Sequence, residues 1–294
     1  MSLCFSRNAA HCLLLFAGVL LGGCEGKQPA DDELYQAVDT LHAEVLSGAH
    51  QFGIIAEIDH SRLAMESGEV MPPARVIIFS NSTVNTAILE QKPLAALDLP
   101  FRVLTYADGD SPKVIYTPAE FLVRRHGVTE SPGLESYRTS LEAVVAAVPK
   151  ENRVVFDVSN LAAGQGIREL NSIHGFSESI ERLKEAILAE GDTIWFGELD
   201  FQAEAKEHGV DLPALTLLLF GAPGPGAKAM AEYPRMGLDA FCQKVLVYQQ
   251  PDDKVKVYFN EMPAFAELHH GSVALPHRVI NRRMTATLAG AVEE

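Results

Sequence analysis

The sequence has little cysteine, a deficit of basic residues and no long apolar run beyond its first 30 residues. Lys and Arg number 24 against 39 Asp and Glu, a net charge of −15. This excludes nucleic acid as an expected partner, because a phosphate backbone is bound through clustered basic side chains. The lack of an 18-residue apolar run after residue 30 excludes a multi-span membrane protein. An apolar fraction of 47% is nevertheless enough for a substantial folded core.

The first residues have the pattern of an export signal. One cation, Arg7, precedes an apolar segment from Cys12 to Leu21, and Leu-Gly-Gly then leads to Cys24. A positive start, a short apolar middle and a small-residue exit are typical of a secretory signal peptide. The Cys after Leu-Gly-Gly resembles the lipobox of bacterial lipoproteins. The resemblance implies a signal peptide over 1–23 and acylation, as with palmitate, of Cys24. The alternative is an ordinary signal peptide with a coincidental Cys.

A lipid on Cys24 would anchor the protein to a membrane in the cell envelope, facing the periplasm. The tether, residues 24–30, reaches at most roughly 24 Å when extended, so the body is expected close to the bilayer. Glu25, in place of the Asp associated with inner-membrane retention, favours the outer membrane by analogy with lipoproteins. Removal of the signal peptide leaves Cys242 as the sole thiol besides Cys24, so no internal disulfide is expected.

The body of the chain is a tandem duplication of one unit. Residues 54–99 align with 195–240 without a gap, at an offset of about 141. The offset then drifts, and His126-Gly127 meets His270-Gly271 further along. We therefore expect a first repeat domain over 31–150, a connecting segment over 151–166 and a second repeat domain over 167–294. The matched pairs include Glu57/Glu198, Asp59/Asp200, Gly68/Gly209, Pro93/Pro234 and Asp98/Asp239.

Both repeats predict the same series of helices and strands. The apolar spacing and the turn residues indicate an α+β fold: two tandem homologous domains, each a mainly antiparallel sheet with packed helices. A further apolar stretch, 154–158, is predicted to be a strand that braces the first repeat from the connecting segment. The predicted strands are 54–59, 75–80, 101–106 and 114–116 in the first repeat, and 168–173, 194–200, 215–220, 244–248 and 255–259 in the second.

Several short sequence motifs resemble those of the domain-of-unknown-function family 302. They are Ile58-Asp59-His60, Leu97-Asp98-Leu99-Pro100-Phe101-Arg102 and His126-Gly127 in the first repeat, and Phe220-Gly221-Ala222-Pro223 and Gly237-Leu238-Asp239 in the second. The resemblance implies a β-α-β-rich fold with a TBP-like arrangement, and no established activity.

The two copies have lost different parts of this pattern. The first has Ser80-Asn81-Ser82 in place of the Phe-Gly-x-Pro loop, and the second has Phe201 in place of His60. A composite site between the halves and loss of the site both remain open.

Weak catalytic candidates are Glu57, Asp59, His60 and His126. Glu57 and Asp59, two apart on a strand, share one face and have the chemistry for acid–base work or for holding a cation. A solvated acidic sheet face is the simpler interpretation, and His60 is expected to be a partly exposed residue at the end of the strand. No Cys-linked or His-x-x-x-His metal spacing occurs.

The loop from Gly221 to Lys228 lies where a phosphate loop would. It departs from the P-loop because Ala227 separates the last Gly from the Lys and Ala229 replaces the hydroxyl residue. We interpret it as a turn-forming loop and expect no cofactor. We also expect no catalytic role for Cys242, which lacks a matched His partner.

The hypothesis from the sequence is a non-catalytic, lipid-anchored periplasmic binding or scaffold protein. Its partner, an unknown small molecule or a protein, would bind between the repeats. The alternatives are a hydrolase-type enzyme using Glu57, Asp59 and His60, or metal capture by the acidic strand face. The possible ligand surface comprises Glu198, Asp200, Asp98, Asp239 and His270.

Overall fold

A computed structural model describes residues 29–294 of the chain. The predicted signal peptide, Cys24 and the first part of the predicted tether lie outside these residues. No helix within 29–294 is long and apolar enough to cross a membrane.

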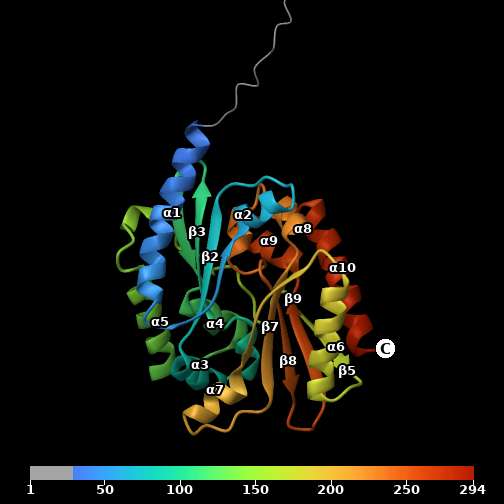
Figure 1. The fold of residues 1–294 in the computed structure, drawn as a ribbon. Coiled ribbons are helices and arrows are strands. Elements are labelled where there is room, and N and C mark those ends of the chain that lie inside the picture. The colour runs from blue at the N-terminus through green and yellow to red at the C-terminus, as the bar shows by residue number, and fades with distance from the viewer. Residues whose placement is uncertain (1–28) are drawn as a thin grey trace, which may run out of the picture.

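The first repeat is a four-stranded antiparallel sheet in the order β1-β2-β3-β4. The helices α1 and α5 pack together on its outer side, at the left of Figure 1. Its elements are α1 (Pro29–Ala49), β1 (Gly53–Asp59), α2 (His60–Glu66), β2 (Ala74–Ser80), α3 (Ser82–Leu89), η1 (Pro93–Leu97), β3 (Phe101–Asp108), β4 (Ser111–Tyr116), α4 (Ala119–His126) and α5 (Pro132–Val145).

The second repeat has the same series and one additional strand, giving the order β5-β9-β8-β7-β6. The helices α6 and α10 cover its outer side, at the right of Figure 1. After the short η2 (Lys150–Asn152), the elements are β5 (Ile167–Ser172), α6 (Phe176–Ala189), β6 (Ile194–Asp200), α7 (Phe201–Glu207), β7 (Leu215–Gly221), α8 (Pro223–Met230), η3 (Pro234–Gly237), β8 (Gln243–Gln249), β9 (Val255–Asn260), α9 (Met262–His270) and α10 (Leu275–Val292). The predicted α+β fold of two antiparallel sheets with packed helices is confirmed.

The duplication extends to local details of the backbone. The matched strands β1 and β6 both carry a register irregularity at matched positions, between Ile54 and Ala56 and between Trp195 and Gly197. The Asp at the end of each strand caps the next helix: Asp59 accepts from the Arg62 N–H at 2.9 Å, and Asp200 from the Ala203 N–H at 2.9 Å. These residues therefore have a structural role that satisfies free N–H groups in the first helical turn.

The predicted strand at 154–158 is wrong. The connecting segment makes a single parallel bridge, Val114 with Arg153, and the Val154 N–H donates to the Val114 carbonyl at 2.8 Å. It thus starts beside β4 and then leaves the sheet. Phe156 explains the departure, because its ring packs edge-on against Phe121 and against His269 of the second repeat.

The two repeats share one core. The matched 3-10 helices η1 and η3 each cross to the other repeat: η1 contacts β7 and β8, while η3 contacts β2 and β3. The helix pairs α2–α8 and α3–α7 also bridge the repeats. The main cluster of buried apolar side chains includes residues of both sheets, for example Leu97 and Leu104 with Leu217 and Leu246. The interface is therefore built like a domain interior.

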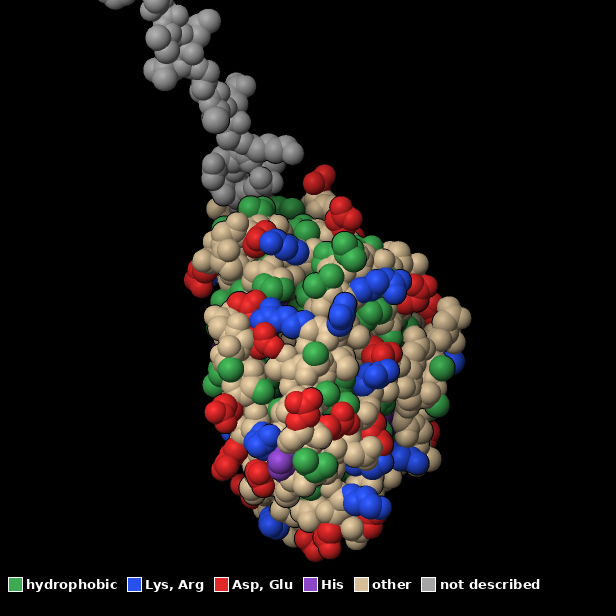
Figure 2. Space-filling view, turned by 90° about the vertical axis from the view of Figure 1, so that its right-hand side faces the viewer, with side chains coloured by type: hydrophobic (Ala, Val, Ile, Leu, Met, Phe, Trp, Pro, Cys, Tyr) green, Lys and Arg blue, Asp and Glu red, His purple; other side chains and the backbone are tan. Residues whose placement is uncertain are grey.

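The face covered by α6 and α10 carries basic and acidic side chains interspersed (Figure 2). The acidic excess of the chain therefore does not gather there as a patch of one sign. A charge-driven macromolecular contact has no evident footprint on this face.

Candidate functional site

Buried charged groups from both repeats meet between the two sheets. We call this group the inter-repeat charge cluster. All of its side chains are buried. It comprises Asp98, Arg102, Thr117, Arg125 and His126 from the first repeat, and Asp239, Lys244, Asn260 and His269 from the second.

The two aspartates of the cluster bind reciprocally across the interface. Asp98, which follows η1, accepts from Nη1 of Arg125 in its own repeat at 2.5 Å and lies 3.4 Å from Nζ of Lys244 in the other. Asp239, which follows η3, accepts from Nε2 of His269 in its own repeat at 2.9 Å and from Nη2 of Arg102 in the other at 2.9 Å. Each aspartate thus holds one cation across the interface.

The duplication explains this reciprocity. Asp98 and Asp239 are matched at the offset of 141, and Arg102 and Lys244 occupy matched places opposite Ile78 and Leu219 in their sheets. Because η1 and η3 cross over, each aspartate reaches the basic residue on the other repeat's strand. Breaking one such buried pair would leave an uncompensated charge, which is strongly destabilising.

The cluster contains more donors than acceptors. Every oxygen of Asp98 and Asp239 has at least one basic or hydroxyl partner. In contrast, Nε and Nη1 of Arg102 and Nδ2 of Asn260 are buried without a hydrogen-bond partner among the described residues. Two carboxylates also face three side chains with basic groups, Arg102, Arg125 and Lys244, before the histidines are considered. Such a site has the composition to hold an additional acceptor of negative charge.

A small cavity opens beside two members of the cluster, Lys244 and Asn260. It has a volume of about 10 Å³, close to the minimum for one water molecule or a similarly sized ion. Lys244 and Asn260 contribute its polar donors. The cavity is lined by Asp239, Ala240, Gln243, Lys244, Asn260, Met262 and Met284.

Burial and neighbouring charges shift the pKa values of the ionisable groups in the cluster. Burial opposes ionisation of Asp239, but Arg102 and His269 outweigh it and lower its pKa to about 2. The pKa of Asp98 is likewise held well below its usual range, since Arg125, Lys244 and His126 outweigh its burial. Burial, and next the charge of Arg102, lower the pKa of Lys244 to about 8 despite both aspartates. Lys244 is therefore a buried cation that titrates near neutral pH.

The remnants of the family pattern also come together between the repeats. His60 lines a cavity of about 20 Å³ with Gly221-Ala222-Pro223 of the second repeat and Cys242. The expectation of a partly exposed His60 is wrong, because the residue begins α2, where that helix packs on the second repeat, and is 6% exposed. Its Nε2 has no hydrogen-bond partner among the described residues, and burial lowers its pKa to about 4. Cys242 is a buried free thiol whose pKa is raised by burial to about 11.

The other acidic candidates belong to separate surface networks. Glu57 and Asp59 share one face, as predicted, and both lie against Arg75, at 2.7 Å and 3.7 Å. Glu57 also lies 3.1 Å from Nε2 of His42. These contacts do not link the pair to His126, which binds Asp98 at 2.6 Å in the cluster.

The candidate residues Glu198, Asp200 and His270 of the second repeat also lie in separate contacts outside the cluster. Glu198 pairs with Lys184, Asp200 caps α7, and His270 packs its ring against Tyr233. Of the possible ligand surface predicted from the sequence, Asp98 and Asp239 meet in the cluster, whereas these three lie elsewhere. Among the described residues, no group of three or more His, Cys, Asp or Glu side chains is placed to hold a metal ion.

Sequence reasoning missed the basic half of the cluster. Arg102 stands in a quoted motif, but its match is not visible at the offset of 141, where Gln243 falls. The matched residue is Lys244, because the second repeat has one more residue between Asp239 and β8 than the first has between Asp98 and β3. Arg125 falls on His269 at the later offset, so its charge is not repeated. A search for basic residues after the drift in offset would have found Lys244.

Comparisons with known proteins place the chain in a family. Parts of the chain are also similar to curated proteins and to a solved structure. Stretches 38% identical over 78 residues occur in proteins named fluoride-specific ion channel FluC from Brucella suis and Brucella abortus, covering 26% of this chain and 30% or 28% of those proteins. The chain therefore spans less than a third of the length of these relatives. A crystal structure of an uncharacterized conserved DUF302 protein from Bacillus stearothermophilus is 21% identical, with a TM-score of 0.38 over 42% of this chain and 95% of that one.

The family match covers both repeats. Residues 28–148 and 168–292 each match the family described as domain of unknown function DUF302. Together the two matches span most of the 294 residues. The chain belongs to the DUF302 family and contains its domain twice.

Proposed function

We propose that this protein binds a small anion, either a monatomic ion or a carboxylate, in the inter-repeat charge cluster. One observation carries the proposal: all the carboxylate oxygens of the cluster are paired, while buried N–H groups of Arg102 and Asn260 are not. A buried donor without a partner is costly, and a buried cation without a counter-ion costs more. An anion beside Lys244 and Asn260 would give the amide of Asn260 an acceptor and would offset the excess positive charge of the cluster.

A water molecule or a metal ion in this cavity would account less well for the unpaired donors and the excess positive charge of the cluster. A water molecule satisfies the donor of Asn260 but leaves the excess positive charge uncompensated. A metal ion would face Lys244 in a cavity whose only carboxylate, that of Asp239, already binds Arg102 and His269. The buried ion pairs alone would suffice to fix how the repeats pack. They do not explain why the unpaired groups are all donors.

The relatives suggest a first anion to try. Proteins named as fluoride-specific ion channels contain a stretch similar to part of this chain. Fluoride is close in size to a water molecule, and the cavity has room for about one. Fluoride is therefore the first probe, with chloride and formate as comparisons of larger size.

We further propose that the protein acts at a bacterial membrane surface, anchored by a lipid on Cys24. The support is the signal-peptide pattern and the Leu-Gly-Gly-Cys phrase in the sequence. Labelling of growing cells with radioactive palmitate tests this directly. Label should enter the wild-type protein and be absent from the Cys24→Ala variant. Incorporation that survives this substitution would contradict lipidation at Cys24.

Thermal unfolding in the presence of anions tests the binding proposal. For residues 25–294 at constant ionic strength, fluoride or formate should raise the unfolding midpoint in a saturable manner, because a ligand that binds only the folded state stabilises it. Isothermal titration calorimetry then gives the affinity. A midpoint unchanged by fluoride, chloride and formate alike would contradict the proposal.

The Asn260→Asp variant makes the test specific to the cluster. It keeps the oxygen that accepts from Nη2 of Arg125 at 2.8 Å and supplies a built-in carboxylate oxygen where Nδ2 was unpaired. We expect this variant to fold and to lose most of its response to anions. Asn171→Asp, the same chemical change on an exposed strand position, should respond as the wild type does. A normal response from Asn260→Asp would place the binding elsewhere.

A further inference from the structure

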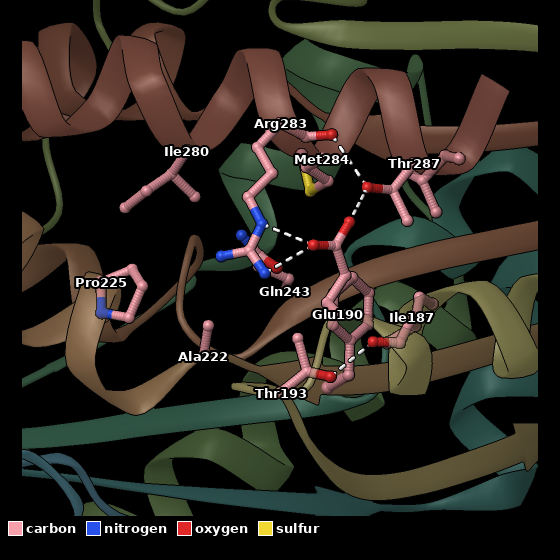
Figure 3. Close-up of a pocket in the computed structure, with 12 residues that line it drawn as sticks. Ile187, Glu190, Thr193, Ala222, Pro225, Gln243, Ile280, Arg283, Met284 and Thr287 are labelled. Carbon is pink, nitrogen blue, oxygen red and sulfur yellow. Dashed lines mark hydrogen bonds and ion pairs between the residues drawn. The ribbon is translucent and has the colours of Figure 1, made fainter. Parts of the chain in front are cut away.

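A third, larger pocket lies in the second repeat, between α6, α10 and the strands β7 and β8 (Figure 3). Its volume is about 40 Å³. Most of the side chains that form its walls are apolar. They include Ile187, Phe220, Pro225, Ile280, Met284 and Leu288.

The polar groups at the edge of this pocket are already paired with one another. Arg283 donates to Glu190 at 2.8 Å and to both oxygens of Asp192 at 2.6 and 2.7 Å. Glu190 also accepts from the hydroxyl of Thr287, and Thr193 donates to a backbone carbonyl of α6. Figure 3 shows the contacts of Glu190 with Arg283 and Thr287, and that of Thr193 with Ile187. The pocket therefore offers a ligand mainly apolar walls, and the polar groups at its edge are already hydrogen-bonded.

This apolar pocket adjoins the cavity of the charge cluster. Gln243 and Met284 line both spaces. In Figure 3, Gln243 lies behind the guanidinium group of Arg283. The Gln243 side chain is 7% exposed and its amide has no hydrogen-bond partner among the described residues. A short rearrangement of these two flexible side chains would join the pocket to the cavity.

We propose that the ligand of this chain is a short-chain monocarboxylate that occupies both spaces. The inference rests on the proposed anion site and names its ligand class. The carboxylate accepts hydrogen bonds from Nζ of Lys244 and Nδ2 of Asn260, and the amide of Gln243 is placed to donate a third. The hydrocarbon tail passes Met284 and lies against the apolar walls of the outer pocket. Charge complementarity thus fixes one end of the ligand, and apolar burial favours the other.

Affinity measured along a series of chain lengths tests this inference. The probes are formate, acetate, butyrate and hexanoate, titrated calorimetrically into residues 25–294. Each buried CH₂ group should increase the affinity about fourfold, until the outer pocket is full. Butanol and hexanol, which have a tail and no charge, should bind far more weakly than the acids of the same length.

A pair of variants on one helix makes the test specific to the outer pocket. Ile280→Phe adds bulk to a residue that lines the pocket and should abolish the gain with chain length while formate still binds. Val279→Phe makes a similar change at the neighbouring position, which is 57% exposed and not among the pocket residues. It should behave as the wild type does. The series measured on the wild type keeps the test decisive even if Ile280→Phe folds poorly.

The possible outcomes separate the two proposals. If formate or fluoride binds and the affinity does not rise with chain length, the monocarboxylate inference is wrong and the anion site stands. If alcohols bind as well as acids, or if Asn260→Asp leaves hexanoate binding unchanged, the outer pocket binds its ligand without the cluster and the inference is overturned. If no anion binds at all, the proposed function fails first.

Discussion

Lys244 is the residue whose protonation determines the charge of the inter-repeat cavity. Burial lowers its pKa to about 8 in the protein. Deprotonation removes the positive charge nearest to the proposed anion. Anion affinity should therefore be constant from pH 6 to about 7.5 and should fall up to tenfold per pH unit above the pKa of the free protein, about 8. A bound anion favours the charged lysine and raises its pKa, so the decline should level off above the pKa of the complex.

Titrations with formate between pH 6 and 10 measure this dependence. The control is Lys244→Arg, which places at this position the residue that occupies the matched site in the first repeat, Arg102. An arginine stays protonated throughout this range. The variant should keep its affinity at high pH. An equally steep loss in Lys244→Arg would assign the pH dependence to another group.

His60 gives a second residue-scale prediction, on stability in acid. Its folded-state pKa of about 4 lies below the ordinary value of about 6.5, so the unfolded chain binds a proton first as the pH falls. The stability of the folded state should therefore decrease between pH 6.5 and 4. At pH 4.5 the loss from this residue should be on the order of 2–3 kcal/mol.

Urea unfolding of the wild type and of His60→Phe at pH 7.5 and 4.5 tests this expectation. Phe occupies the matched position in the second repeat as Phe201, and the adjoining cavity of about 20 Å³ gives its ring room. The variant should lose less stability between the two pH values. The pKa of His270 is also lowered to about 4, but it is present in both proteins and cancels in the comparison. Equal losses would show that His60 is not buried as a neutral group.

At the scale of elements, Gly48 lets α1 and α5 pack in backbone contact. A Cβ on Gly48 would lie 2.3 Å from the carbonyl oxygen of Val144. Gly48→Ala should therefore separate the two helices and destabilise the fold by roughly 1–3 kcal/mol. Gly290, within α10, has no atom within 4 Å of such a Cβ. Gly290→Ala should instead stabilise the fold by roughly 0.5–1 kcal/mol, since Gly is a poor helix residue. Chemical denaturation of both variants measures this contrast, and two changes of the same sign would contradict it.

Elements were the part of the fold most predictable from the sequence. The duplication shows the pattern of each strand and helix twice, and the glycines of the matched His-Gly motifs, Gly127 and Gly271, both form left-handed helix caps. The prediction of a strand at 154–158 was wrong because apolar residues predict that a segment is buried but do not predict which element it packs against. Phe156 is buried against the other repeat instead of in a ladder.

The candidate site was only half predictable for a related reason. Asp98 and Asp239 are repeated and could be named from the sequence. Their partners depend on the crossing of η1 and η3 between the repeats, which no local pattern encodes. His60 was expected at the surface because the end of a strand often lies there. The packing of α2 against α8 covers it instead.

At the scale of the whole molecule, the shared core predicts that the two repeats unfold together. Side chains from both sheets form one main buried cluster, and the aspartate of each repeat holds a basic residue of the other. Unfolding either repeat would expose the apolar surface of its partner and leave Arg102 or Lys244 without its counter-ion, at a cost of several kcal/mol. An intermediate with one folded repeat should therefore not be populated.

Differential scanning calorimetry of residues 25–294 tests this cooperativity. We expect one transition with equal calorimetric and van't Hoff enthalpies. Asp239→Asn, which weakens the hold of the second repeat on Arg102 of the first, should lower the midpoint of that single transition without splitting it. The cause is electrostatic, so the variant should differ less from the wild type as the pH falls toward 2, where the aspartate, with its pKa of about 2, loses its charge. Two separate transitions in the wild type would mean that the repeats are independent domains, and the buried charge cluster would then need another reason to span them.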